Sequence, residues 1–127
     1  MSILDIFKNK ISPVKVGLLR EDKIFVQRKW AEIEELIRLG SPSNFSRAVV
    51  EADKLLDFTL KKLNYPGEKM GDRIRSARGK FSDYGGVWNA HILRNQIVHE
   101  PEHELLSFSA KKAVEDFKKA LVDLRGL

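Results

Sequence analysis

Three polar side chains in the last third of the chain could act together on a phosphodiester: Arg94, Asn95 and His99, within the stretch RNQIVHE. A histidine, with an ordinary pKa of about 6.5, can accept the proton of a ribose 2′-hydroxyl. An arginine stays charged and stabilises negative charge on the phosphate, while an asparagine can hold either group by hydrogen bonds. The pattern therefore predicts metal-independent RNA cleavage that leaves a 2′,3′-cyclic phosphate and spares DNA.

His91 adds a fourth polar side chain to the helix expected over residues 87–100. With about 100° of rotation per residue, His91, Asn95 and His99 follow one slowly drifting line along that helix. Arg94 lies within about 140° of His99. We expect this face to border a cleft or a partner, with His91 in contact with the substrate. The apolar positions on the opposite side are Leu93 and Ile97.

These residues also have purely structural interpretations. His99 can cap the end of its helix, where a positive charge interacts favourably with the helix dipole. Arg94 can form an ion pair with Asp53, which borders an apolar stripe where an unpaired carboxylate is costly. Asp53 is therefore expected either to orient Arg94 or His99, or to be a solvated residue at the rim of that stripe.

A basic run precedes the polar helix. It consists of Arg73, Arg75, Arg78 and Lys80. Such a run is commonly a solvated face, but in a ribonuclease it would carry RNA phosphates toward the cleft. Tyr84 or Trp88 could then stack on a base.

A metal site is not expected. His91, His99 and His103 are the three histidines, but Pro101 interrupts the helical register between the last two, and no fixed carboxylate joins them. The chain has no cysteine, which excludes disulfides, thiolate zinc sites and cysteine nucleophiles. We expect neither metal nor cofactor.

Length and composition indicate one domain. The chain has 127 residues, of which 43% are hydrophobic and 32% charged, as in globular proteins. No stretch approaches the roughly 18 apolar residues that a membrane span needs, and no signal peptide is recognisable. A soluble protein in a reducing, cytoplasmic setting fits best. The net charge of +5 favours polyanions, though the basic residues are spread along the chain.

Apolar residues at three- and four-residue spacing predict helices over most of the chain. The first spans Glu21 to Leu39 and ends at Gly40, and the second is capped by Ser41-Pro42 and runs to about Asn64. A basic third helix lies within residues 68–81, the sequence SDYGG breaks it, and Pro101 ends the fourth. A fifth begins at Ser107 or Ser109. The apolar positions of the first helix are Ile24, Phe25, Trp30, Ile33, Leu36 and Ile37.

No strand pattern is found, so the expected fold is all-α, an antiparallel bundle of four or five helices over residues 19–127. Residues 1–18 form a separate amphipathic segment, which either packs on the bundle or a dimer partner, or lies on a membrane surface. Its apolar positions are Ile3, Leu4, Phe7 and Ile11.

The motif R-N-x-x-x-H on the penultimate helix of a small bundle resembles the signature of HEPN domains (higher eukaryotes and prokaryotes nucleotide-binding). The specific match covers Arg94 to His99, and the helical framework extends it over about Glu21 to Leu124. The resemblance implies a four- or five-helix bundle that dimerises and brings two motifs into one cleft. It also implies Arg94 and His99 as catalytic residues, with Asn95 as the polar residue that follows the arginine.

Two classes of function follow from this resemblance. The first is a homodimeric, metal-independent endoribonuclease of the kind found in toxin–antitoxin, defence and RNA-processing systems. The second is a non-catalytic HEPN module that binds nucleotide, RNA or a protein partner, such as a nucleotidyltransferase antitoxin. A helical bundle of unrelated ancestry remains a third alternative.

Overall fold

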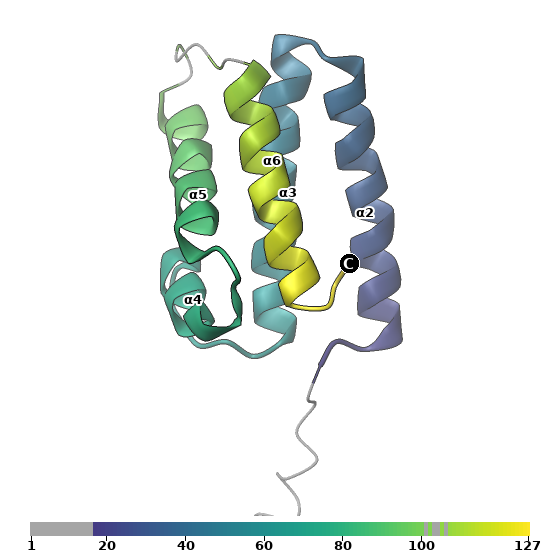
Figure 1. Ribbon diagram of the computed structural model, residues 1–127, viewed down its shortest axis with the longest axis vertical. Coiled ribbons are helices and arrows are strands. Elements are labelled where there is room, and N and C mark those ends of the chain that lie inside the picture. Colours follow the sequence, from purple (N-terminus) through teal and green to yellow (C-terminus); the bar gives the residue numbers. More distant parts are fainter. Residues whose placement is uncertain (1–16, 101, 103–104, 106) are drawn as a thin grey trace, which may run out of the picture.

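The computed structural model describes residues 17–100, 102, 105 and 107–127. Over these residues the protein is all-α: five helices pack together with one short 3-10 turn, and there is no strand. The helices are α2 (Arg20–Leu39), α3 (Pro42–Lys62), α4 (Met70–Ser76), α5 (Tyr84–His99) and α6 (Ser107–Asp123), with η1 at Arg78–Lys80 (Figure 1). The predicted all-α bundle is thus confirmed. The proposed segment 1–18 and Pro101 lie almost wholly outside the described residues.

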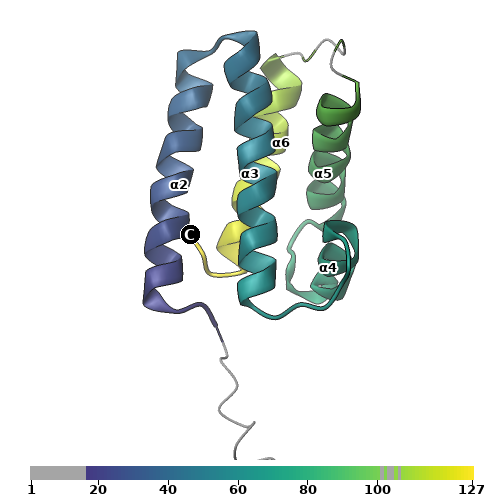
Figure 2. The same cartoon turned by 180° about the vertical axis from the view of Figure 1, so that it is seen from behind.

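The four long helices alternate in direction along the chain. Figure 1 shows α5 and the short α4 at one edge of the bundle and α2 at the opposite edge, and Figure 2 shows the same order from behind. Between these edges, α3 packs against α2, α4, α5 and α6. The polar helix α5 lies at one edge of the bundle, and its inner side packs against α3 and α6.

The start of α3 follows the sequence signals closely. Gly40 ends α2 with a left-handed backbone (φ 73°), and the Ser41 hydroxyl accepts a hydrogen bond from the Asn44 amide at 3.2 Å. Pro42 occupies the first position, where no amide donor is needed. Of the apolar stripe that the spacing predicts for α3, Phe45, Val49, Ala52, Leu56 and Leu60 are buried, and Leu63 is half-buried. This helix supplies the centre of the core.

The prediction for the apolar face of α2 was partly wrong. Trp30 and Ile33 are buried as expected, but the third buried apolar residue is Val26, whereas Ile24 and Phe25 are 45% and 37% exposed. Ile24 lies two residues from Val26, which turns it by about 200° away from the core. Phe25 packs instead against Phe58 of α3, with 4.7 Å between ring centroids.

The ends of the shorter helices also differ from the prediction. The expected third helix is divided into α4 and η1, and α5 begins at Tyr84, one turn earlier than expected. The early start is possible because the Asp83 carboxylate caps the helix and accepts from the Gly86 amide at 2.9 Å. A Cβ on Gly86 would lie 2.5 Å from an oxygen of Asp83, so a larger residue there would displace the capping carboxylate. The two glycines therefore begin the helix rather than break it.

Arg73 attaches α4 to the bundle. Its guanidinium donates to both carboxylate oxygens of Asp57 on α3, at 2.7 and 3.2 Å, and to the carbonyl of Gly67 at 2.7 Å. The Arg73 side chain is 10% exposed, whereas that of Arg75 is 59% exposed. A two-pronged contact of this kind fixes direction as well as distance. Arg73 therefore sets the position of α4 beside α5.

Replacing Arg73 with alanine should lower the free energy of unfolding by about 1–3 kcal/mol, because the Gly67 carbonyl loses a donor and Asp57 keeps only Lys61. Arg75→Ala, two residues away and exposed, should change it by less than about 0.5 kcal/mol. Urea unfolding of both variants measures the difference. Equal losses would show that Arg73 does not hold α4 in place.

Candidate active site

The buried carboxylate of Asp53 joins α3 to the polar face of α5. Asp53 is 2% exposed. One of its oxygens lies 2.8 Å from Nδ1 of His91, and the other lies 3.3 Å from Nε of Arg94. Both partners come from α5, three residues apart, so one carboxylate contacts two consecutive turns of the helix face. The three side chains form a compact charged cluster, named here the Asp53 cluster.

Arg94 keeps hydrogen-bonding capacity in this arrangement. Its Nε approaches Asp53 closely but is not aligned to donate, and it finds no other acceptor in the described part of the protein. Nη1 donates to the side-chain oxygen of Asn95 at 3.0 Å. Because a guanidinium has five N–H donors, Arg94 is held by charge at one edge while other donors remain for a ligand.

A cleft of about 380 Å³ adjoins the Asp53 cluster. One wall comes from residues 69–72 and Arg75, in or next to α4, and the other comes from α5. The α5 residues are Trp88, His91, Ile92, Arg94 and Asn95. This volume is within the range of small-ligand sites. The structure therefore brings His91, Arg94 and Asn95 together at one concave surface.

Aromatic rings and guanidinium groups alternate along the first turns of α5, up to Trp88, which lines the cleft. The Arg75 guanidinium lies 4.8 Å from the Trp88 ring centroid, and that of Arg78 lies 4.8 Å from the Tyr84 ring. Trp88 and Tyr84 are stacked at 6.2 Å. A Cβ on Gly71 would lie 3.3 Å from the Trp88 indole, so glycine lets α4 approach the ring closely. These planar groups offer surfaces on which a nucleobase can stack.

The four residues of the basic run, which were predicted to contact substrate, lie in two different environments in the folded protein. Arg75, Arg78 and Lys80 are exposed, Arg75 lines the cleft, and Arg78 lies over the Tyr84 ring at the start of α5. Arg73 instead points inward to Asp57. The sequence alone does not separate these four residues, because their charges are alike and only the packing of α4 on α3 distinguishes them.

His99 lies apart from the Asp53 cluster within one chain. It is exposed at the last residue of α5, eight residues after His91, or about 12 Å along the helix axis. Of the roles considered for Asp53, contact with Arg94 is confirmed, contact with His99 is not found, and a solvated rim position is wrong because the side chain is buried. The contact between Asp53 and His91 was not predicted.

The described residues contain no group of three histidine, cysteine or acidic side chains that could bind a metal ion. His103, the third histidine considered for such a site, lies outside them. Across the same part of the chain, no helix is long and apolar enough to cross a membrane.

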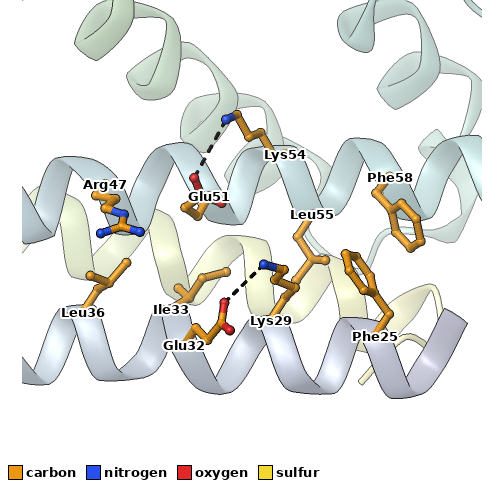
Figure 3. Close-up of a pocket in the computed structure, with 10 residues that line it drawn as sticks. All are labelled: Phe25, Lys29, Glu32, Ile33, Leu36, Arg47, Glu51, Lys54, Leu55 and Phe58. Atoms are coloured by element: carbon orange, nitrogen blue, oxygen red, sulfur yellow. Dashed lines mark hydrogen bonds and ion pairs between the residues drawn. The ribbon is translucent and has the colours of Figure 1, made fainter. Parts of the chain in front are cut away.

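A larger groove of about 650 Å³ runs between α2 and α3, on the side of the bundle away from α5 (Figure 3). Its floor is apolar, and four of its five rim charges form pairs: Lys29 with Glu32 at 3.3 Å, and Lys54 with Glu51 at 3.8 Å. No buried ionisable side chain lines this groove. The cleft beside α5 is therefore the better candidate for chemistry, although it is smaller.

Comparison with known proteins gives no match: no family model fits the chain, and no curated protein or solved structure is significantly similar to it. Functional inference therefore depends on the chemistry of the Asp53 cluster and of the RNQIVHE stretch.

The neutral His91 ring should carry its proton on Nδ1, because the Asp53 carboxylate accepts at that atom. Long-range ¹H–¹⁵N correlation spectra in alkaline buffer distinguish the two ring tautomers. Asp53→Asn, which replaces the charged acceptor by a neutral amide, should weaken this preference at His91 and leave the exposed His99 unchanged. A His91 ring protonated on Nε2 in the parent protein would contradict the geometry.

Proposed function

We propose that this protein is a metal-independent endoribonuclease of the HEPN type, which acts as a homodimer. The observation that carries the proposal is the position of Arg94: a buried carboxylate holds its guanidinium at the edge of a cleft, beside Asn95 and His91. A fixed positive charge at a partly enclosed surface is suited to stabilise charge that develops on a phosphate. The R-N-x-x-x-H motif supports the same assignment.

In the proposed reaction, an imidazole accepts the proton of the 2′-hydroxyl and the 2′-oxygen attacks the adjacent phosphorus. The bond from phosphorus to the 5′-oxygen breaks, and that oxygen takes up a proton. The products are a 2′,3′-cyclic phosphate and a 5′-hydroxyl. His99 is the proposed base, Arg94 stabilises the charged phosphate, and Asn95 orients the Arg94 guanidinium through its 3.0 Å hydrogen bond.

The surroundings of the cleft suit a single RNA strand. Arg75, Arg78 and Lys80 supply exposed positive charge, and Trp88 and Tyr84 supply stacking surfaces beside it. Charge contacts hold the phosphate backbone irrespective of sequence, while stacking holds unpaired bases. Asp72, which pairs with Arg75 at 3.1 Å, leaves the surface less positive there than the basic run suggests.

A non-catalytic module that binds nucleotide or RNA is the second candidate. The contact between Arg75 and Trp88 favours it, because a cation and an aromatic ring in one cleft suffice for binding without chemistry. An association with a protein partner such as a nucleotidyltransferase belongs to this alternative. Measurements of cleavage and of binding on the same samples separate the two candidates.

Incubated with mixed RNA in EDTA, the protein should produce fragments with cyclic-phosphate ends, and substrates with a 2′-deoxy residue at the scissile position should stay intact. His99→Ala should lower the cleavage rate by about a hundredfold or more, because the base is lost while the exposed site leaves the bundle intact. Gel analysis with end-group determination gives both results.

Arg94 needs a conservative replacement, since its removal would leave Asp53 with one partner. Arg94→Lys keeps the charge but loses the planar fork, so it should remain folded and cleave much more slowly than the parent. Gln96→Ala, on the exposed side of the same helix, is the matched control and should cleave normally. Loss of activity in EDTA, or full activity in both His99→Ala and Arg94→Lys, would overturn the catalytic proposal.

A further inference from the structure

The groove between α2 and α3 leaves aromatic surface uncovered in the described part of the protein. Its volume is about 650 Å³, and side chains of the two helices line it from end to end (Figure 3). At one end, called here the aromatic end, Phe25 packs against Phe58 and is still 37% exposed. A groove with an apolar floor and a charged rim is suited to receive an amphipathic helix.

The rim charges of this groove are arranged in levels, because α2 and α3 run in opposite directions. Three pairs of residues face each other across the groove, four, seven and eleven residues from the contact between Phe25 and Phe58. They are Lys29 with Lys54, Glu32 with Glu51, and Leu36 with Arg47. From the aromatic end, the rim is therefore positive, then negative, and positive again at the far end, about 16 Å away. Arg47 at that far end has no ion-pair partner among the described residues.

The stretch of chain that precedes the bundle has a matching pattern in its sequence. Residues 1–16 lie outside the described part of the protein, which begins at Gly17 beside the start of α2. On a helix, four apolar residues of this stretch fall within about 100° of one another. Lys8 then lies at one edge of the apolar face and Lys10 at the other, with Asp5 beyond Lys8 on the same side. The four apolar residues are Ile3, Leu4, Phe7 and Ile11.

The connection to α2 determines how this stretch can enter the groove. Pro13 interrupts the helical pattern, so a helix over residues 3–11 is followed by a link of five residues. When extended, this link spans up to about 18 Å, whereas the start of α2 is only about 8 Å from the aromatic end along the helix axis. The helix, about 12 Å long, then points its first residue toward the Arg47 end. A short link also keeps the effective concentration of the helix near the groove high.

One register matches the charges at every level of the groove. With Asp5 level with Arg47, the two lysines lie about 4.5 and 7.5 Å further along, and the two glutamates of the rim are about 6 Å from Arg47. Because the helix is right-handed and lies in front of the two helices as Figure 2 shows them, Lys8 is on the α3 side and Lys10 on the α2 side. A carboxylate has about four acceptor sites, so each glutamate can accept from this lysine beside its present partner.

We propose that residues 3–11 dock as a helix in the groove between α2 and α3 of the same chain, with Lys8 beside Glu51 and Lys10 beside Glu32. The apolar face of the docked helix covers the floor of the groove, and Asp5 lies at the Arg47 end. The docking does not depend on RNA cleavage, because the groove lies on the side of the bundle away from α5.

Pairs of engineered cysteines test the position and the direction of the docked helix, because the chain has no cysteine of its own. Under mild oxidation, Lys8→Cys with Glu51→Cys should form a disulfide within one chain, and so should Lys10→Cys with Glu32→Cys. The exchanged pairs are the matched controls: Lys8→Cys with Glu32→Cys, and Lys10→Cys with Glu51→Cys. Their thiols lie on opposite sides of the docked helix, so they should link at least about tenfold more slowly. Gel mobility and mass spectrometry of peptide digests measure the linkage.

Each other occupant of the groove gives a different result in this experiment. Disulfide-linked dimers would show that the segment enters the groove of a second copy. Faster linkage of the exchanged pairs would show the opposite direction of docking, and equal rates in all four variants would show no fixed position. Failure of every pair to link would overturn the docking as well. Sedimentation of the parent protein with phosphatidylglycerol vesicles would then assign the apolar face of the segment to a membrane surface.

The apolar contact has its own test in the protein with Lys8→Cys and Glu51→Cys. Phe7→Asp should lower the rate of disulfide formation by about tenfold or more, because a carboxylate is costly to place on the apolar floor. Asn9→Asp, turned by about 200° from Phe7 to the outer side of the helix, is the matched control and should link at the rate of the parent pair. Equal rates in the two variants would show that the apolar face does not hold the segment in the groove.

Discussion

The buried carboxylate of Asp53 is the interaction on which the candidate site depends. Removing a carboxylate from water costs several kcal/mol unless partners compensate for the lost hydration. Here both partners, His91 and Arg94, belong to α5, so the charge of Asp53 on α3 fixes how α5 is turned against the bundle. The imidazole and the guanidinium are thereby held in place before any substrate binds, which is the arrangement that electrostatic stabilisation of a charged phosphate requires.

The remaining elements complete the site around this contact. Arg73 fastens α4 to α3 through Asp57 and so builds the second wall of the cleft, and Gly71 allows that wall to approach Trp88. The apolar inner side of α5 keeps the helix on the bundle, while its outer side leaves Ile92 exposed beside the polar residues. The single helix α5 thus serves both the core and the cleft.

The sequence predicted the fold better than the site. The three- and four-residue spacing in α3 and the capping Ser41 were sufficient to place that helix, because both are local signals. Asp53 was recognisable as a carboxylate beside an apolar stripe, but several polar residues of α5 could have met it. Which residue of α5 contacts Asp53 depends on the rotation of α5 relative to α3, and no local sequence pattern predicts that rotation. The burial of Arg73 was unpredictable for the same reason.

Buried charge clusters can often be replaced by apolar side chains without loss of stability. Such a replacement in the Asp53 cluster would keep the fold but remove the charged groups, so it distinguishes a structural role of the cluster from a chemical one. The most direct measurement is therefore RNA cleavage by a variant in which Asp53→Leu, His91→Leu and Arg94→Met are combined, with its unfolding monitored alongside. Our account predicts a folded bundle of similar stability that leaves RNA uncut while the parent cleaves it. Cleavage at the parental rate by this variant would contradict the account, as would a parent protein that also leaves RNA intact.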